Sequence, residues 1–533
     1  MKNQNSTNTF IRIENSYLFS IQNVLKNKLP VKYVRSFIVL CSFLCLSNSS
    51  LLANNLTISA PTVVGGNLQF TIQWDNSWNT TLGPGNYDAV WVFVKRQVCG
   101  GTQNWDHSLL STVSGNHSVT GGVLQVDAVS DGVGVFIRRS ATGNGNIASS
   151  TVTLNLQAAA NLVDNFQVFG VEMVYVPTGN FIIGDGNPGN AVPYPFNGTT
   201  ITAATQAAGF ANANAYQTSG HGSTAALPAA YPQGYNAFYC MKYEVSQEQY
   251  VKYLNSLTFT QQNARTNISP ASATGLWPIQ TASPNNSRNG IRIMTPGTAL
   301  TTPAIYGCDL NVNGTYNEAA DGQNIACNWL SWPDLMTYLD WSGLRPMTEM
   351  EFEKVCRGSG IPSIPNEYAW GTTTILQATS GALTNGGQST EVSTASGNGL
   401  CAYNAANQTT FGPLRCGSAA GAATTRAQSG AAYYGVMDMS GNVAEQCVGG
   451  YNFNYSSFNG LNGDGTITAA GLFNTANWPT AGGGQAGGIA RGGYFGPLTG
   501  GFGEARVSDR NWMTSNWNQT KNSAGGGRGV RIP

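Results

Sequence analysis

Apolar and polar side chains alternate along four short runs in the range 54–158. The apolar positions are Leu68, Phe70, Ile72 and Trp74; Val90, Val92 and Val94; Val133, Val135 and Ile137; and Val152, Leu154 and Leu156. A two-residue period places the apolar side chains on one face of a strand, and turns rich in Gly, Asn and Ser separate the runs. The pattern predicts a small all-β sandwich domain over 54–158.

A polar, alanine-rich linker at 157–165 precedes the second predicted domain, which covers 166–533. It opens with a predicted hairpin over Met173–Gly184, with its turn at Pro177–Asn180. The ranges 185–233 and 258–303 are predicted as loop insertions; the first is rich in Gly, Ala, Asn and Pro and has no periodicity.

Capping residues predict three helices in this second domain. Ser246–Gln249 and Thr348–Glu351 both have the form of a capping box, in which side chains satisfy the first amide groups of a helix. Ser331 begins the third helix, over Trp332–Trp341, and glycines at 343 and 358 follow two of the helices. Together with the irregular strands and long loops, these helices predict an α+β domain.

Composition narrows the classes of partner. The chain has 533 residues, more than one ordinary domain, and only 10% of them are charged, with a formal net charge of zero. A protein that binds nucleic acid usually carries a basic surface, so the composition argues against nucleic acid as a partner. A protein, a glycan or a small molecule is expected instead.

The first 53 residues have the pattern of a secretory signal peptide with a long n-region. Four basic residues, Lys26, Lys28, Lys32 and Arg35, precede the mainly apolar run Ser36–Leu46, and Ala53 offers a small residue for cleavage. The run is too short to span a membrane, so no transmembrane helix is expected in the mature chain. The pattern predicts a secreted or cell-envelope protein; a buried core strand is the alternative.

Eight cysteines remain after cleavage: Cys99, Cys240, Cys308, Cys327, Cys356, Cys401, Cys416 and Cys447. An even number in an exported chain permits disulfides, but eight cysteines allow 105 connectivities and the sequence does not choose among them. Local loops closed by Cys308 with Cys327 and by Cys401 with Cys416 are the plausible pairs.

Seven blocks resemble, in the same order, the formylglycine-generating enzyme (sulfatase-modifying factor) family. They are Met173–Gly184, Tyr239–Ser246, Trp332–Lys354, Ala369–Gly371, Asp438–Glu445, Arg491–Gly493 and Gly529–Arg531. The resemblance covers about 170–533 and implies the family's fold, a variant of the C-type lectin fold. The predicted sandwich lies outside it.

The resemblance also implies a calcium site in the segment Asp438–Glu445. Matching it position by position gives Asp438 and Glu445 as side-chain ligands and the carbonyl oxygens of Gly441 and Val443 as backbone ligands; Asn404 matches a second calcium position more loosely. Such an oxygen-rich ligand set suits Ca²⁺. In the alternative, the two carboxylates cap loops and pair with arginines.

A separate calcium candidate lies at Asp309, Asn311 and Asn313, followed by Gly314. Oxygen donors at the first, third and fifth places and a glycine at the sixth are typical of EF-hand-like loops. The twelfth place is Ala320, however, so the loop would depart from the standard geometry. A loop closed by Cys308 and Cys327 without a metal is the alternative.

The oxidases of the family use two cysteines shortly after the Arg-Gly-Gly stretch to bind copper(I), an ion that prefers soft thiolates. The corresponding stretch here, Gly492–Arg506, contains no cysteine. We therefore predict no catalytic residues and no copper. The predicted function is a non-catalytic, calcium-stabilised binding or scaffold protein of the cell envelope. The alternatives are a formylglycine-generating oxidase with thiols from elsewhere and a carbohydrate-binding, lectin-like protein.

The candidates for ligand binding are Trp512, Trp517, Arg506 and Arg510. Exposed Trp on a loop can stack on a sugar face, and Arg can bind acidic groups. The alternative is a structural role, with the tryptophans packed in the core and the arginines tying loops together through carboxylates and carbonyls.

Overall fold

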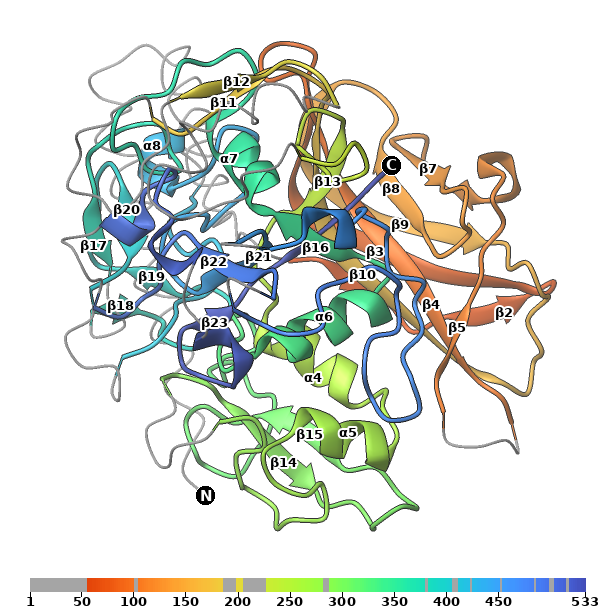
Figure 1. Cartoon of the computed structure of the whole chain (residues 1–533). Helices are drawn as coiled ribbons and strands as arrows, with labels where there is room; N and C mark the ends of the chain where they lie inside the picture. Colours follow the sequence, from red (N-terminus) through yellow and green to blue (C-terminus); the bar gives the residue numbers. More distant parts are fainter. Residues whose placement is uncertain are drawn as a thin grey trace, which may run out of the picture. The chain divides into compact units, whose positions relative to one another are not determined.

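The runs of alternating residues form strands in two sheets (Figure 1). In the computed structural model the described residues are 55–99, 104–185, 198–204, 227–280, 287–378, 382–404, 411–421, 424–450, 453–483, 486–497, 503–513 and 517–533. The predicted signal peptide, 1–53, lies outside them.

The smaller sheet has five strands in the order β1-β3-β9-β6, with β2 paired to β3. Their bounds are β1 Thr57–Ile58, β2 Thr62–Val64, β3 Asn67–Asn79, β6 Ser118–Val119 and β9 Gly143–Leu154. Side chains at alternate positions of β3 are buried, as its sequence predicts.

The larger sheet has eleven strands in the order β22-β21-β16-β24-β13-β10-β4-β8-β7, with β23 paired to β21 and β5 to β4. Their bounds are β4 Asp88–Gln97, β5 Asp106–Ser108, β7 Leu124–Ala128, β8 Val135–Arg139, β10 Asn165–Val176, β13 Phe238–Met241, β16 Arg345–Thr348, β21 Ala444–Val448, β22 Gly488–Arg491, β23 Gly525–Gly526 and β24 Gly529–Arg531.

Strand β4 is buried on both faces. Val90, Val92 and Val94 pack with Phe70 and other residues of the smaller sheet in one core cluster, as the alternation predicts. The opposite face carries Trp91, together with Ala89 and Phe93, in the large core cluster that is formed mostly by residues after 170. Alternation therefore identified the strand, but not that both of its faces are covered.

Strand β10 continues the larger sheet across the predicted linker. It pairs antiparallel with β4 from Asn165↔Gln97 to Val174↔Asp88, and its other edge pairs with β13 from Met173↔Met241 to Val176↔Phe238. Segments before and after the predicted linker thus share one sheet. A self-contained sandwich domain over 54–158 stays a prediction.

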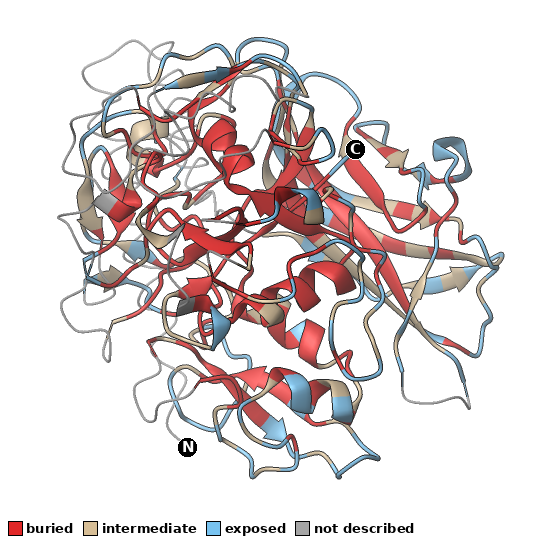
Figure 2. Ribbon diagram, in the orientation of Figure 1, coloured by how far each residue is buried: buried red, intermediate tan, exposed pale blue. Residues whose placement is uncertain are grey.

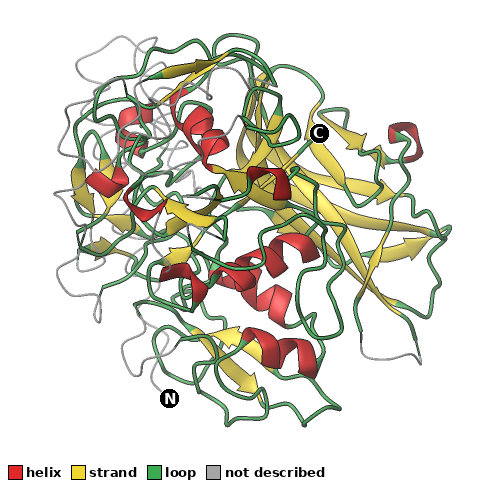
Figure 3. Cartoon of the chain, in the orientation of Figure 1, coloured by secondary structure: helices red, strands yellow, loops and turns green. Residues whose placement is uncertain are grey.

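The three predicted helices are confirmed: α4 Gln247–Leu254, α6 Trp332–Trp341 and α7 Glu349–Arg357 (Figure 3). Capping boxes at Ser246 and Thr348 begin α4 and α7. Every residue of α7 is buried, and the central strands β13, β16, β21 and β22 are also buried (Figure 2).

Regular structure also occurs where the sequence predicted loops. The range 258–303 contains the helix α5 Phe259–Arg265, begun by a capping box at Thr258, and the strand β14 Ile291–Thr295, which pairs with β15 Ile305–Cys308. The range 185–233 contains the strand β12 Thr199–Ile201, which pairs with β11 Phe181–Ile183. Because β11 does not pair with β10, the predicted hairpin pairing is wrong.

Further short elements occur in the described part of the chain. They are β17 Leu376–Ala378, which pairs with β20 Leu400–Ala402; β18 Leu383–Thr384, which pairs with β19 Val392–Ser393; and the helix α8 Arg426–Ser429. The described fold is thus mostly strand and loop with few helices. None of these helices combines the length and apolar character needed to cross a membrane.

Candidate functional site

The segment from Asp438 to Val443 turns sharply before β21. Asp438, Gly441 and Asn442 have φ angles of 58°, 82° and 64°, in the left-handed region. A Cβ atom on Gly441 would lie 2.3 Å from the carbonyl oxygen of Ala402. Glycine is therefore required at 441, both for its backbone conformation and for this close approach.

Three carboxylates surround this turn: the buried Glu244 and Glu445, and Asp438, which is half-buried. Glu244 accepts hydrogen bonds from the Val443 backbone N–H at 3.0 Å and from Nδ2 of Asn442 at 2.5 Å. Asp438 accepts one from the backbone N–H of Gly417 at 2.6 Å. Glu244 was not among the predicted site residues, although it lies in the block Tyr239–Ser246.

Glu445 faces Arg528. Nε of Arg528 donates to Oε1 of Glu445 at 2.5 Å, and both side chains are buried. The pairing with an arginine is the alternative role that the sequence left open for this glutamate. The second carboxylate oxygen of Glu445, Oε2, is buried and has no hydrogen-bond partner among the described residues.

Burial raises the pKa of all three carboxyl groups, because the charged form loses its hydration. Asp438 and Glu445 raise the pKa of Glu244 further through charge repulsion, whereas Arg528 lowers it. A cation bound among these groups would remove the repulsion and stabilise the charged forms.

The donor set suits an oxygen-seeking cation. It offers the unpaired oxygen of Glu445, the Asp438 carboxylate and the backbone carbonyls of the turn. Within the described residues, no three His, Cys, Asp or Glu side chains are grouped so that they alone could hold a metal ion. An ion at this turn would therefore need backbone oxygens as well.

Asn404 occupies a separate position at the end of a described segment. Its φ is 53°, its backbone N–H donates to Gly496 at 2.9 Å, and its carbonyl oxygen accepts from Nε2 of Gln377 at 2.9 Å. No hydrogen bond among the described residues joins it to Asp438 or Glu445. Asn404 as a ligand at a second calcium position therefore stays a prediction.

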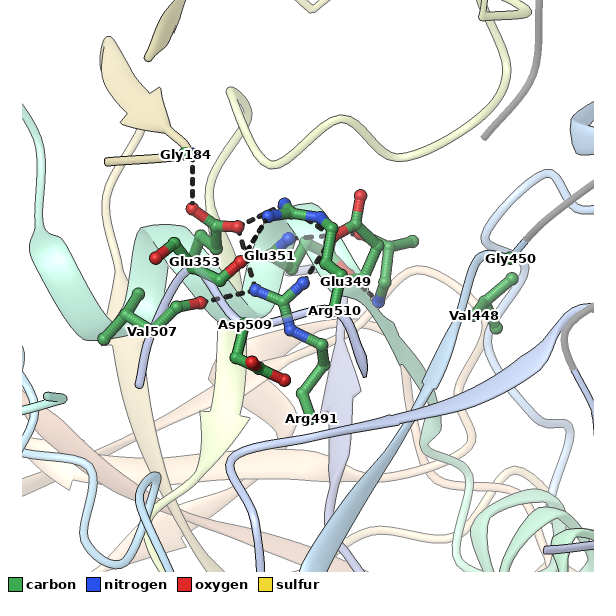
Figure 4. A network of polar contacts seen from close by, with 12 residues as sticks. Gly184, Glu349, Glu351, Glu353, Val448, Gly450, Arg491, Val507, Asp509 and Arg510 are labelled. Atoms are coloured by element: carbon green, nitrogen blue, oxygen red, sulfur yellow. Dashed lines mark hydrogen bonds and ion pairs between the residues drawn. The ribbon is translucent and has the colours of Figure 1, made fainter. Parts of the chain in front are cut away.

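Arg510 lies in the interior, in a network with Arg491 (Figure 4). Both guanidinium groups donate to Oε2 of Glu349 at 2.9 Å, and Arg491 also donates to Oε1 of Glu353 at 2.8 Å. Arg510 and Arg357 contact Glu353 as well. Arg510 therefore has the loop-tying role that the sequence left open, and its guanidinium is not presented to solvent.

Burial opposes ionisation of Glu353, but Arg510, Arg357 and Arg491 together lower its pKa to about 2. Its Oε2 also accepts the backbone N–H of Gly184 at 2.8 Å. The carboxylate thus connects α7 to Gly184, which follows β11, to β22 through Arg491 and to the loop that carries Arg510.

The remaining ligand candidates lie near aromatic side chains. Trp512 is half-buried, with its ring centroid 5.8 Å from that of Tyr494. Arg506 is also half-buried and hydrogen-bonds to Tyr368. Trp517 begins a 3₁₀ turn, Trp517–Gln519, and its side chain lies outside the described part of the chain.

None of the eight cysteines is in a disulfide, so the two predicted bridges are absent from this structure. Cys401 donates instead to the carbonyl oxygen of Ser440 at 2.9 Å, and Cys416 to that of Glu244 at 3.6 Å. All but Cys99 are buried. Burial raises the pKa of the Cys240 thiol to about 12, so this side chain stays a neutral thiol at neutral pH.

Asp309, Asn311 and Asn313 lie together in a loop that follows β15, with a hydrogen-bond network of their own. The structure brings these three residues together, and their role as calcium ligands stays a prediction.

The family model for the sulfatase-modifying factor enzyme 1-like domain matches residues 160–532. No curated protein matches the chain. The matched range contains both the carboxylate turn and the arginine–glutamate network.

Proposed function

Since the chain belongs to the sulfatase-modifying factor family, we propose that it is a non-catalytic, calcium-stabilised binding or scaffold protein of the cell envelope. Its family domain would have the lectin-like fold of its relatives. A location in the cell envelope requires export of the chain, and the proposal of export is based on the signal-peptide pattern in the sequence. The observation that carries the non-catalytic proposal is the state of the cysteines.

The copper(I) chemistry implied by the family resemblance needs thiolates that can reach an ion. All seven cysteines within the matched range are buried. Desolvation raises the pKa of each of them, which disfavours the thiolate form. This supports a domain that keeps the family's fold without its oxidase chemistry.

A thiol count tests this proposal. In the chain from Leu52 onward, we expect one thiol, Cys99, to react rapidly with Ellman's reagent in the native state, and all eight to react after unfolding. Copper(I) should then bind weakly, and oxygen uptake with a cysteine-containing peptide should not exceed that of the peptide alone. The variant Cys99→Ser serves as the control and should show no rapid phase. Stoichiometric copper(I) binding with turnover would establish the oxidase alternative instead.

For calcium, the side chains of Asp438 and Glu445 and the carbonyl oxygens of Gly441 and Val443 would hold the ion. When bound, Ca²⁺ supplies positive charge to carboxylates whose burial is otherwise unfavourable. The unpaired oxygen of Glu445 supports this assignment, because Arg528 occupies only Oε1. The role of the ion is to stabilise the turn.

Removing one ligand charge tests this site. Asp438→Asn keeps an acceptor for the Gly417 N–H, and Asn tolerates the positive φ, but the substitution removes one negative charge. We expect the affinity of this site for Ca²⁺ to fall by about tenfold or more, since ligand charge tunes calcium affinity. Isothermal titration measures the change, with Glu248→Gln, an exposed site on α4, as the matched control. An unchanged titration would remove this turn as a calcium site.

Glycan binding is the second candidate, because Trp512 is half-exposed beside Tyr494. A glycan-binding protein should lose retention on a glycan column when Trp512→Ala is introduced. A scaffold should keep its envelope partner in co-purification despite this change.

A further inference from the structure

The loop from Asp309 to Asp321 is organised around the first of these residues. Oδ1 of Asp309 and Oδ1 of Asn311 both accept the backbone N–H of Asn313, at 3.1 and 3.0 Å. Oδ2 of Asp309 accepts from Gly314 at 3.3 Å. Because two oxygens share one donor nitrogen, the side chains at the first and third places converge on the same point.

The end of the loop at Asp321 lies close to its beginning at Asp309 and Leu310. A Cβ atom on Gly290 would lie 2.9 Å from the carbonyl oxygen of Asp321 and 3.0 Å from the backbone nitrogen of Leu310. The backbone at 310 therefore lies next to the backbone at 321. The side chain of Asp321 joins the loop through Oδ2, which accepts the backbone N–H of Glu318 at 2.8 Å.

The other oxygen of Asp321 is an unsatisfied buried group. Asp321 is 0% exposed, and its Oδ1 has no hydrogen-bond partner among the described residues. An unpaired buried carboxylate oxygen is costly, so its presence points to a ligand.

The net charge around the loop is negative, which favours the binding of a divalent cation. Asp309, Glu318 and Asp321 carry three negative charges, and Arg292, with Nε 3.8 Å from Oδ2 of Asp309, carries one positive charge. Three minus one leaves two negative charges unbalanced. Arg292 itself is held against the ring of Trp277, with its guanidinium carbon 4.1 Å from the ring centroid.

We propose that the loop 309–321 binds one Ca²⁺ ion through the side chains of Asp309, Asn311, Asn313 and Asp321, independently of the turn at 438–445. The first three ligands have the one-three-five spacing of calcium loops, and Asp321, one place beyond the usual twelfth position, supplies the closing carboxylate.

The ligand chemistry favours calcium over a softer metal. The described loop offers carboxylate and amide oxygens, and Ca²⁺ takes six to eight oxygen ligands in a flexible arrangement. No three acidic, His or Cys side chains in the described residues are grouped closely enough to hold an ion by themselves, so the asparagine oxygens are needed. The tip of the loop, Asn311–Thr315, is exposed, and this gives an ion access from solvent.

Proteolysis within the loop tests the proposal separately from the other calcium site. Chymotrypsin can cleave after Tyr316, which lies inside the loop. In the chain from Leu52 onward, we expect saturating Ca²⁺ to slow this cleavage by about tenfold or more relative to EDTA, because a bound ion suppresses local opening. Cleavage at the same rate with Ca²⁺ and with EDTA would overturn the proposal.

Substitutions show whether Ca²⁺ bound at this loop, rather than at the turn 438–445, slows the cleavage after Tyr316. Asp321→Asn should abolish the calcium-dependent protection and lower the titrated stoichiometry by one ion per chain, whereas Asp438→Asn should leave the protection at Tyr316 intact. Glu248→Gln, which removes an exposed charge on α4, should behave like the parent. Protection that survives in Asp321→Asn, or that is lost in Asp438→Asn, would contradict an independent site here.

A gain-of-affinity variant keeps the test valid if Asp321→Asn folds poorly. Nδ2 of Asn313 donates to Oε2 of Glu318 at 2.7 Å, so Asn313→Asp would place two carboxylates together in the absence of an ion. We expect this variant to be cleaved faster in EDTA and to bind Ca²⁺ about tenfold more tightly, because ligand charge increases affinity. An affinity equal to that of the parent would count against the proposal.

Discussion

Replacing Glu353 by Gln should lower the free energy of unfolding by about 3–5 kcal/mol, the usual cost of removing one partner from a buried ion pair. The cost is high because Arg491 and Arg510 (Figure 4) and also Arg357 contact this carboxylate. None of the three arginines is exposed to water. Urea unfolding followed by tryptophan fluorescence measures the change. The matched control is Glu248→Gln, which breaks an exposed pair with Lys252 and should cost about 0.5 kcal/mol or less.

The loss of unfolding free energy caused by Glu353→Gln should depend on pH. The pKa of Glu353 is lowered from 4.5 to about 2 in the folded protein. A carboxyl group with a depressed folded pKa contributes stability above pH 4.5, and this contribution is lost as the pH falls toward 2. The difference in unfolding free energy between the parent and Glu353→Gln should therefore shrink over this range. A difference that stays constant from pH 5 to pH 2.5 would show that the charge of Glu353 does not stabilise the network.

A fragment covering 160–533 should fail to fold as a stable monomer, although it contains the entire range matched by the family. Without the preceding residues, one edge of β10 loses its ten-residue pairing with β4. The core also loses Trp91, Phe93 and Phe136, which pack in the same cluster as α6 and α7. Three large apolar side chains are worth about 1.5–3 kcal/mol each, a loss comparable to the total stability of a domain.

Polar contacts also make the fold of residues 160–533 depend on the residues that precede them. Trp91 donates to the carbonyl oxygen of Ser342 at 2.8 Å, and Asn86 to that of Tyr434 at 2.8 Å. Arg531 pairs with both oxygens of Asp131, at 2.5 and 2.7 Å. The shorter fragment would leave these buried partners unsatisfied.

The measurement compares two fragments, 52–533 and 160–533, by size-exclusion chromatography and near-ultraviolet circular dichroism. The longer fragment should show one cooperative unfolding transition, and the shorter one should aggregate or lack fixed tertiary signals because its edge strand is exposed. Addition of the fragment 52–159 should restore part of the signal. A monomeric, cooperatively unfolding 160–533 fragment would show instead that the family domain is independent of the N-terminal strands.

Part of the candidate site was predictable because its signal is local. The segment 438–445 was identified from contiguous residues that match a block of the family, whereas the buried strand β21, Ala444–Val448, was not predicted. Glu244 was missed because it lies 194 residues before Asp438 (438 minus 244) and no spacing rule connects the two. Arg510 is a ligand candidate in the sequence but a buried structural residue in the fold. Its partners Glu349 and Glu353 lie on α7, far from it in the chain, so local sequence does not reveal the contact.

The sequence by itself determined the helices α4, α6 and α7 and many of the strands of this protein. The capping boxes at Ser246 and Thr348 and the alternation in β3 depend on neighbours within a few residues, so local spacing encodes them. Only the tertiary structure decided that β10 pairs with both β4 and β13 and that both faces of β4 are buried. It also decided that the eight cysteines of the described chain are free thiols and form no disulfides. These features depend on contacts between residues far apart in the chain, which cooperative packing selects and local patterns do not specify.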